Sequence, residues 1–349
     1  MVTDITINNL GVHAHLPLNQ LGSVNVVLGE NDTGKTSLIK LIYAVCRAIE
    51  ESGLKQQEPL KKILADKILG TFQPRGELGN LVRKGQTEKL SCELTFENGS
   101  TKQNLYFSFG AKTTNTINDC TSHLDKVENG FNALFIPAKE VLTAFDAIAA
   151  TRENLYMDGF DDTYLDLIRA LRIKTSKGNI SKELTGVNKT LEDLFEGSVS
   201  QNSKDDSFIF KKKNTEFVMS MTAEGIKKIG ILTTLIRNRR LGRNTILFMD
   251  EPETALHPKA IRKLAEMLAA MSRCGVQIFL TSHSYFLIKQ LTIIARRDNQ
   301  DFSCISLEQQ QNKTVTAVIS KLNQGLPDNP IIQAAMDMFT EEMSVEVNR

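Results

Sequence analysis

The sequence has few of the features that mark membrane, secreted or repetitive proteins. Its five cysteines are scattered, odd in number and without metal-ligand spacing, which is typical of reduced thiols in a cytosolic protein. No apolar run reaches the length of a membrane span, and the first residues lack the basic start and apolar core of a signal peptide. Internal repeats and low-complexity segments are missing too. We therefore expect a cytoplasmic protein without membrane contact.

A strong net charge is also missing. The 349 residues carry a formal net charge of +1, with 41% hydrophobic and 24% charged residues, as in ordinary soluble globular proteins. No global field therefore attracts nucleic acid or membranes, and any such surface has to be local. The densest basic run consists of Arg237, Arg239, Arg240 and Arg243. No aromatic residues alternate with these arginines, so a solvated face is the simpler interpretation, while nucleic-acid contact stays open.

The sequence does contain a complete phosphate-binding loop of the form G-x-x-x-x-G-K-[ST]. A short apolar strand, 24–28, precedes it, and apolar residues at helical spacing, 38–45, follow it. Strand, loop and helix together direct backbone N–H groups and a positive helix end at one phosphate chain. We expect Lys35 to reach the β- and γ-phosphates of ATP and the Thr36 hydroxyl to hold Mg²⁺. The predicted nucleotide ligands are Gly29, Glu30, Asn31, Asp32, Thr33, Gly34, Lys35, Thr36 and Ser37.

A second group of reactive residues follows in the C-terminal half. An apolar strand, 245–249, ends in Asp250 and Glu251. Asp250 is expected to orient Mg²⁺, and Glu251 is expected to polarise the attacking water as general base. Another apolar strand, 276–281, leads to His283, which can donate a hydrogen bond to a γ-phosphate. The predicted catalytic residues are Lys35, Glu251 and His283, and the predicted metal ligands are Thr36 and Asp250.

Hydrophobic patterning predicts an α/β fold. Strands at 90–96, 104–109 and 133–136 are expected to form an antiparallel sheet beside the phosphate loop, with a polar loop at 111–130. Helical spacing begins near residue 139 and indicates a helical lobe inserted into the nucleotide-binding core. We divide the chain into 1–138, the N-terminal part of the core with an antiparallel β subdomain; 139–206, the helical lobe; and 207–349, the C-terminal part of the core with a C-terminal helix.

The order of these motifs resembles the head of an ABC-class ATPase, and more narrowly the heads of SMC-type, RecF-type and overcoming-lysogenization-defect (OLD) ATPases. Asp250 to Pro258 resembles the Walker B motif and D-loop of that group, and Thr281 to Ser284 resembles its switch-histidine strand. Transporter subunits of the class usually have an aspartate where this chain has His257. The resemblance covers about 1–45 and 215–290. It implies a P-loop ATPase head with a mostly parallel core sheet.

The resemblance also implies a signature motif at a helix start just before Walker B. The candidate is Ala223, Glu224 and Gly225, of which only the glycine keeps the usual serine-glycine-glycine core. In these families the motif contacts ATP held by the other subunit, so a homodimer around ATP is expected. The missing serine hydroxyl indicates a slow ATPase. Lys139 or Glu140 would take the place of the Q-loop residue, with Gln73 as the alternative.

Two output elements of related proteins have no counterpart here. OLD nucleases carry a Toprim domain after the switch histidine, but the stretch after His283 is short and has no matching acidic cluster. Long heptad segments of the SMC type are missing as well. We therefore expect an ATP-hydrolysing switch subunit that controls a separate effector, a nuclease or toxin, as in prokaryotic phage-defence and retron-type modules. The alternative is a RecF- or SMC-like ATPase that binds DNA directly in repair or recombination; a transporter subunit is a third, disfavoured reading.

Overall fold

The computed structural model describes residues 1–54, 57–98, 101–124, 131–173, 182–202, 207–310 and 314–347. Within these ranges the chain folds into a mixed α/β structure, so the predicted fold class is confirmed. All five cysteines are free. None of the helices in the described ranges combines the length and the apolar character that a bilayer crossing requires.

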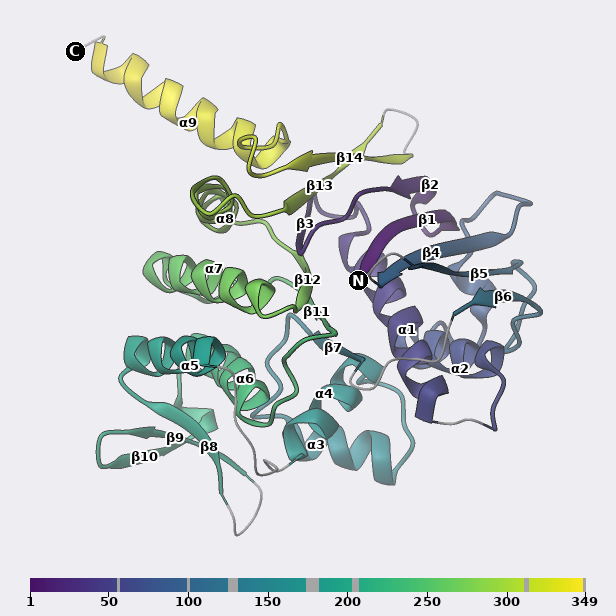
Figure 1. The fold of residues 1–349 in the computed structure, drawn as a ribbon, viewed down its shortest axis with the longest axis horizontal. Helices are drawn as coiled ribbons and strands as arrows, with labels where there is room; N and C mark the ends of the chain where they lie inside the picture. Colours follow the sequence, from purple (N-terminus) through teal and green to yellow (C-terminus); the bar gives the residue numbers. More distant parts are fainter. Residues whose placement is uncertain are drawn as a thin grey trace.

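The elements follow one another in a mixed order (Figure 1). The strands are β1 (Val2–Leu10), β2 (His13–Leu18), β3 (Val24–Gly29), β4 (Leu90–Asn98), β5 (Thr101–Phe109), β6 (Asp119–His123), β7 (Asn132–Ile136), β8 (Ser198–Gln201), β9 (Phe208–Lys212), β10 (Thr215–Val218), β11 (Thr245–Met249), β12 (Gln277–Thr281), β13 (Phe302–Gln309) and β14 (Val315–Lys321). The α-helices are α1 (Lys35–Leu54), α2 (Leu60–Phe72), α3 (Phe145–Ala149), α4 (Asp162–Arg172), α5 (Lys182–Phe195), α6 (Glu224–Arg237), α7 (Pro258–Arg273), α8 (Tyr285–Arg297) and α9 (Pro330–Val347). Short 3-10 or π turns occupy Leu78–Leu81, Ala150–Asn154 and Met219–Met221.

The core sheet has the order β14-β13-β3-β12-β11-β7, and only β14 runs antiparallel to its neighbour. The prediction that 133–136 belongs to the antiparallel sheet was wrong, because β7 pairs in parallel with β11. Every residue of β7 is buried. Such an uninterrupted apolar strand is typical of a parallel sheet covered on both faces, whereas a half-exposed antiparallel strand alternates.

The second sheet is antiparallel and has the order β2-β1-β4-β5-β6. Strand β6 lies in the segment 111–130 that the sequence predicted to be a loop; its five residues are mostly exposed, so they carry no apolar signal. Helix α1 packs between this sheet and the core sheet, because its apolar residues share one core with both. Tyr43 of α1, for example, contacts the rings of Phe135 and Phe248 edge-on.

The opposite face of the core sheet is covered by α4, α6, α7 and α8. The segment 139–206 contains α3, α4 and α5 but also β8, which pairs with β9 beyond it, so the proposed domain limits stay a prediction. Two arginines of the basic run make structural contacts. Arg237 donates to the Val199 carbonyl and Arg240 donates to Asn132. Helix α9 projects away from the body (Figure 1).

Candidate functional site

The phosphate loop joins the end of β3 to the start of α1, as predicted. The Lys35 ammonium donates to the carbonyls of Gly29 at 2.9 Å and Glu30 at 2.8 Å, so the side chain folds back over its own loop. Burial lowers the pKa of Lys35, while Glu251 and Asp250 oppose that shift. The two acidic residues that follow β11 therefore favour the charged form of the phosphate-loop lysine.

Position 34 requires a glycine both because of its backbone conformation and because a neighbouring side chain leaves no room for a Cβ. Its φ of +80° is unfavourable for other residues, and a Cβ there would lie 2.5 Å from Nε2 of His13. The His13 ring is fully buried, and its Nε2 lies 3.2 Å from the Gly34 carbonyl oxygen. Burial lowers the pKa of His13. A neutral imidazole from β2 thus supports the loop, a contact that the sequence did not predict.

Asp250 lies at the carboxyl end of β11, where it faces two hydroxyl groups. Thr36 donates to its two carboxylate oxygens at 3.0 and 3.2 Å, and Thr281 of β12 donates to Oδ1 at 2.6 Å. The described residues form no cluster of three or more His, Cys, Asp or Glu side chains that could hold a metal ion. The pair of Thr36 and Asp250 nevertheless fits Mg²⁺, which takes one or two protein oxygens and completes its shell with phosphates and water.

Glu251 and His283 lie side by side at the ends of neighbouring strands. Nε2 of His283 is 3.3 Å from Oε1 of Glu251, and both side chains are about one-third exposed, at 36% and 37%. The backbone of Glu251 has a φ of +45°, a strained conformation of the kind that gathers at functional sites. Its N–H donates to the Thr281 hydroxyl at 3.0 Å. Both side chains are therefore partly open to solvent at the carboxyl edge of the core sheet.

The predicted signature residues lie at the start of α6. Ala223 is the N-cap but has no side-chain cap hydrogen bond, and the helix begins at Glu224. A Cβ on Gly225 would lie 2.8 Å from Cδ2 of Leu256, so this helix start packs on the loop after Walker B. No hydrogen bond in the described part of the chain joins these three residues to the phosphate loop. If these residues act on the nucleotide of a second subunit, they should lie apart from the phosphate loop of their own subunit.

The Q-loop candidates differ in their contacts. The Gln73 amide donates to the Phe160 carbonyl and accepts from Gly159, so it fixes a loop of the helical lobe. Glu140 accepts from the Thr143 N–H and lies 3.9 Å from the Lys227 ammonium of α6. Lys139 is exposed. Of these residues, only Glu140 links the start of the lobe to the helix that carries the signature candidate.

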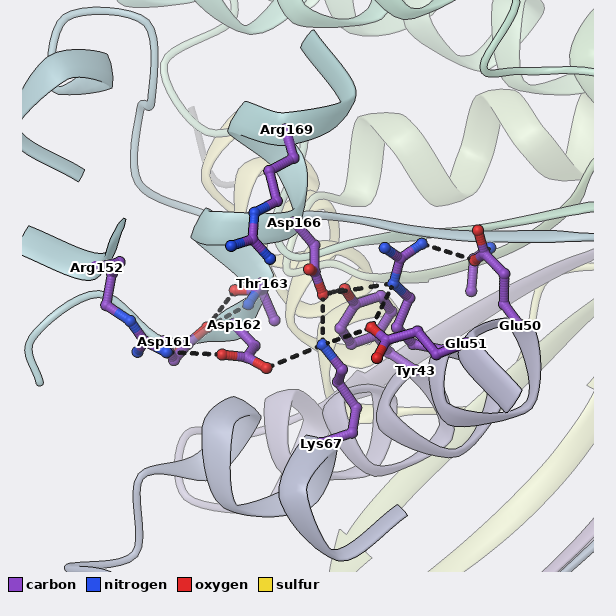
Figure 2. Close-up of polar contacts among 12 residues, drawn as sticks. Tyr43, Glu50, Glu51, Lys67, Arg152, Asp161, Asp162, Thr163, Asp166 and Arg169 are labelled. Carbon is purple, nitrogen blue, oxygen red and sulfur yellow. Dashed lines mark hydrogen bonds and ion pairs between the residues drawn. The ribbon is translucent and has the colours of Figure 1, made fainter. Parts of the chain in front are cut away.

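A buried charge network, which the sequence did not predict, joins α1, α2 and α4 (Figure 2). The Lys67 ammonium lies 3.0 Å from Glu51, 2.9 Å from Asp162 and 3.1 Å from Asp166. The Tyr43 hydroxyl donates to Asp166 at 2.6 Å. Burial would raise the pKa of Asp166, but Lys67 and Arg47 hold it below its usual value. The carboxylate therefore stays ionised inside the protein.

The start of α4 also approaches the nucleotide site. Lys40, one turn after the phosphate loop, lies 2.5 Å from Asp161, the N-cap of α4. Burial, with added repulsion from Asp161 and Asp250, raises the pKa of Tyr164 to about 12. Through Lys40, the start of α4 is thus tied to the helix that follows the phosphate loop.

Residues 24–289 match the model of a protein family described as "AAA domain, putative AbiEii toxin, Type IV TA system". A segment of 41 residues is 46% identical to the Old nuclease of Escherichia phage P2. That segment spans 12% of this chain and 7% of the nuclease, so the chain corresponds to a small part of that relative.

Solved structures of SMC heads share the fold. An SmcHead bound to the C-winged helix domain of ScpA gives a TM-score of 0.55 at 9% identity and covers 93% of this chain and 98% of its own. The SMC head domain from Thermotoga maritima gives 0.51 at 12% identity, with 92% and 99% covered. A Pyrococcus furiosus Smc head bound to the C-terminal domain of ScpA gives 0.51 at 9% identity, with 98% and 99% covered. The resemblance to SMC- and OLD-type ATPase heads is confirmed.

Proposed function

The chain belongs to the family described as "AAA domain, putative AbiEii toxin, Type IV TA system", and from that premise we propose that it hydrolyses ATP with Mg²⁺ and acts as a switch for a separate effector protein. The observation that carries the proposal is the convergence of Lys35, Thr36, Asp250, Glu251 and His283 at the carboxyl edge of the core sheet. In open α/β sheets this edge is where ligands bind.

Each of these residues has a role that its geometry supports. Lys35 would exchange its two loop carbonyls for phosphate oxygens, and Thr36 with Asp250 would hold Mg²⁺, which neutralises phosphate charge. Glu251 would orient the attacking water and accept its proton. His283, beside Glu251, would donate a hydrogen bond to the γ-phosphate.

A slow, dimer-linked reaction fits the signature candidate. Ala223 and Glu224 offer no serine hydroxyl or first glycine to a γ-phosphate, which favours a switch over a motor. Direct DNA binding has less support, because two arginines of the basic run, Arg237 and Arg240, donate hydrogen bonds to groups within this chain. The setting that we propose is a phage-defence or toxin–antitoxin module in the cytoplasm.

Helix α9 is the surface that we assign to the effector. Its projecting part exposes Met336, Phe339 and Met343 at helical spacing, and Met338 is 71% exposed. The acidic residues of the helix are Asp337, Glu341, Glu342 and Glu346, and it has no lysine or arginine. A second copy of α9 or an anionic membrane would be repelled by these carboxylates. A groove with an apolar floor and basic edges on a partner protein would complement them.

Two substitutions separate nucleotide binding from hydrolysis. Lys35→Ala should weaken ATP binding or stop turnover in a folded protein, and unchanged affinity and turnover would refute the phosphate-loop assignment. Glu251→Gln should keep ATP bound but slow its cleavage, and light scattering in ATP should then detect a dimer. A Glu251→Gln protein that binds ATP without added self-association contradicts the dimer.

The switch itself is tested with the purified product of a neighbouring gene as the probe. Because a ligand shifts an equilibrium only by its differential affinity for two states, that protein should bind the ATP-loaded and empty forms differently. Met336→Glu with Phe339→Glu should weaken its binding, whereas Gln333→Glu on the polar side serves as control. Equal binding in both nucleotide states, or DNA cleavage or unwinding by this chain alone, would contradict the switch.

A further inference from the structure

Glu253 is a buried carboxylate for which no catalytic or binding role was predicted from the sequence. Its side chain lies in the loop after Walker B and the residue is 8% exposed. Oε1 accepts from the Ser282 hydroxyl at 2.6 Å and from the His283 N–H at 3.0 Å. Oε2 has no hydrogen-bond partner within the described ranges. Among the described residues, the hydrogen bonds of the Glu253 side chain are thus all made to the segment that carries His283.

A buried carboxylate is costly unless a cation or hydrogen bonds compensate it. Lys228 of α6 supplies a nearby cation, and its ammonium donates to the Glu251 carbonyl at 3.1 Å. Burial lowers the pKa of Lys228, and Glu253 is the strongest of the carboxylates that oppose this shift. Lys228 therefore partly balances the charge of Glu253, while Oε1 keeps its hydrogen bonds to Ser282 and His283.

We propose that Glu253 is a positioning residue that holds His283 in place for ATP hydrolysis. Glu253 fixes the backbone at His283, while the ring lies 3.3 Å from Glu251, so the histidine is held at two points. This inference rests on the proposed ATPase activity. It assigns no contact between Glu253 and the nucleotide.

The same loop packs against the signature helix. Leu256, three residues after Glu253, lies where a Cβ on Gly225 would clash, and Ala255 has a strained φ of +66°. A partner subunit that displaces the start of α6 would therefore press on this loop, and Glu253 would transmit the displacement to His283.

The test compares two substitutions of opposite character. Glu253→Gln keeps the acceptor oxygen in place but removes the charge, whereas Glu253→Asp keeps the charge but withdraws the carboxylate by about one C–C bond, roughly 1.5 Å. Because a misplacement of about 1 Å can cost on the order of 100-fold in rate, Glu253→Asp should lower kcat at least tenfold at nearly unchanged KM for MgATP. Glu253→Gln should stay close to wild type, because the retained oxygen still accepts both hydrogen bonds. Glu266→Ala, which removes a half-buried carboxylate of α7 that pairs with Arg297, is the control.

A double substitution tests whether Glu253 acts on ATP hydrolysis through His283. In a His283→Ala background, Glu253→Asp should lower kcat no further, because there is no imidazole left to position. The inference is overturned if Glu253→Asp keeps wild-type kcat, or if Glu253→Gln lowers kcat more than Glu253→Asp does. It is also overturned if the kcat of the double variant falls by the product of the two single losses, those of Glu253→Asp and His283→Ala. A wild-type protein that binds MgATP but never hydrolyses it would instead refute the proposed ATPase activity.

Discussion

The Thr281 hydroxyl joins the two acidic residues of the candidate site, and replacing it by a methyl group in Thr281→Val is a sharp test of that site. The side chain is fully buried at the end of β12. Its hydroxyl donates to Asp250 Oδ1 at 2.6 Å and accepts from the Glu251 N–H at 3.0 Å. Valine has nearly the same shape as threonine, so the loss is confined to these two hydrogen bonds.

The size of the effect follows from the two bonds. A hydrogen bond to a charged group contributes about 1.5–3 kcal/mol, and a buried donor left unpaired costs about 1–3 kcal/mol. Because the Glu251 N–H is only partly buried, we expect Thr281→Val to lower the free energy of unfolding by about 2–4 kcal/mol. An Asp250 carboxylate that is freed to move by about 1 Å should also lower kcat on the order of 100-fold.

The measurements are urea unfolding followed by circular dichroism and phosphate release from MgATP. Thr281→Ser is the matched control, because it keeps the hydroxyl and should stay close to wild type in both. A Thr281→Val protein with wild-type stability and wild-type kcat would refute the reasoning. So would a serine variant that loses as much as the valine variant.

Further predictions concern the charge network and the phosphate loop. Lys67→Met removes the cation that three carboxylates share and leaves Arg47 and Arg152 as their remaining partners, so urea unfolding should show a loss of about 3–5 kcal/mol, and adding Asp166→Leu should restore part of it. A double variant less stable than Lys67→Met would contradict this. Because the folded pKa of Asp166 is lowered, its stabilising contribution is present above its unfolded pKa of about 3.9 and is lost as the pH falls through the folded value. The stability gap between wild type and Lys67→Met should therefore narrow in urea titrations below about pH 4, and a constant gap would count against the network. Gly34→Ala, whose Cβ would meet His13, should weaken binding of a fluorescent ATP analogue more than tenfold, and unchanged affinity would show that the loop tolerates a side chain.

The motifs of the site were predictable because each is contiguous in the sequence. The phosphate loop, Asp250 with Glu251, and His283 each follow an apolar strand, and β3, β12 and β11 are parallel neighbours. Their carboxyl ends therefore meet at one edge of the sheet. The catalytic and binding roles of these residues stay predictions, whereas the fold class is confirmed.

Contacts between distant residues were not predictable in the same way. His13 and Gly34 meet only because β2 folds beside the loop, and no pattern in the sequence joins them. Lys67 and Asp166 lie on separate amphipathic helices, where charged residues usually face solvent. The parallel pairing of β7 was missed because strand order in a parallel sheet does not follow chain order.

Helix α1 gives the nucleotide site and the helical lobe a common support. Its first turn supplies Lys35 and Thr36, and further along the same helix Lys40 and Tyr43 hold Asp161 and Asp166 of α4. An α-helix of 20 residues transmits displacement as a rigid body, because each turn is hydrogen-bonded to the next. A nucleotide that shifts the first turn of α1 must therefore either move α4 with it or break ion pairs from which water is largely excluded. Since an uncompensated buried charge costs about 3–5 kcal/mol, we expect α4 to follow α1 rather than to separate from it.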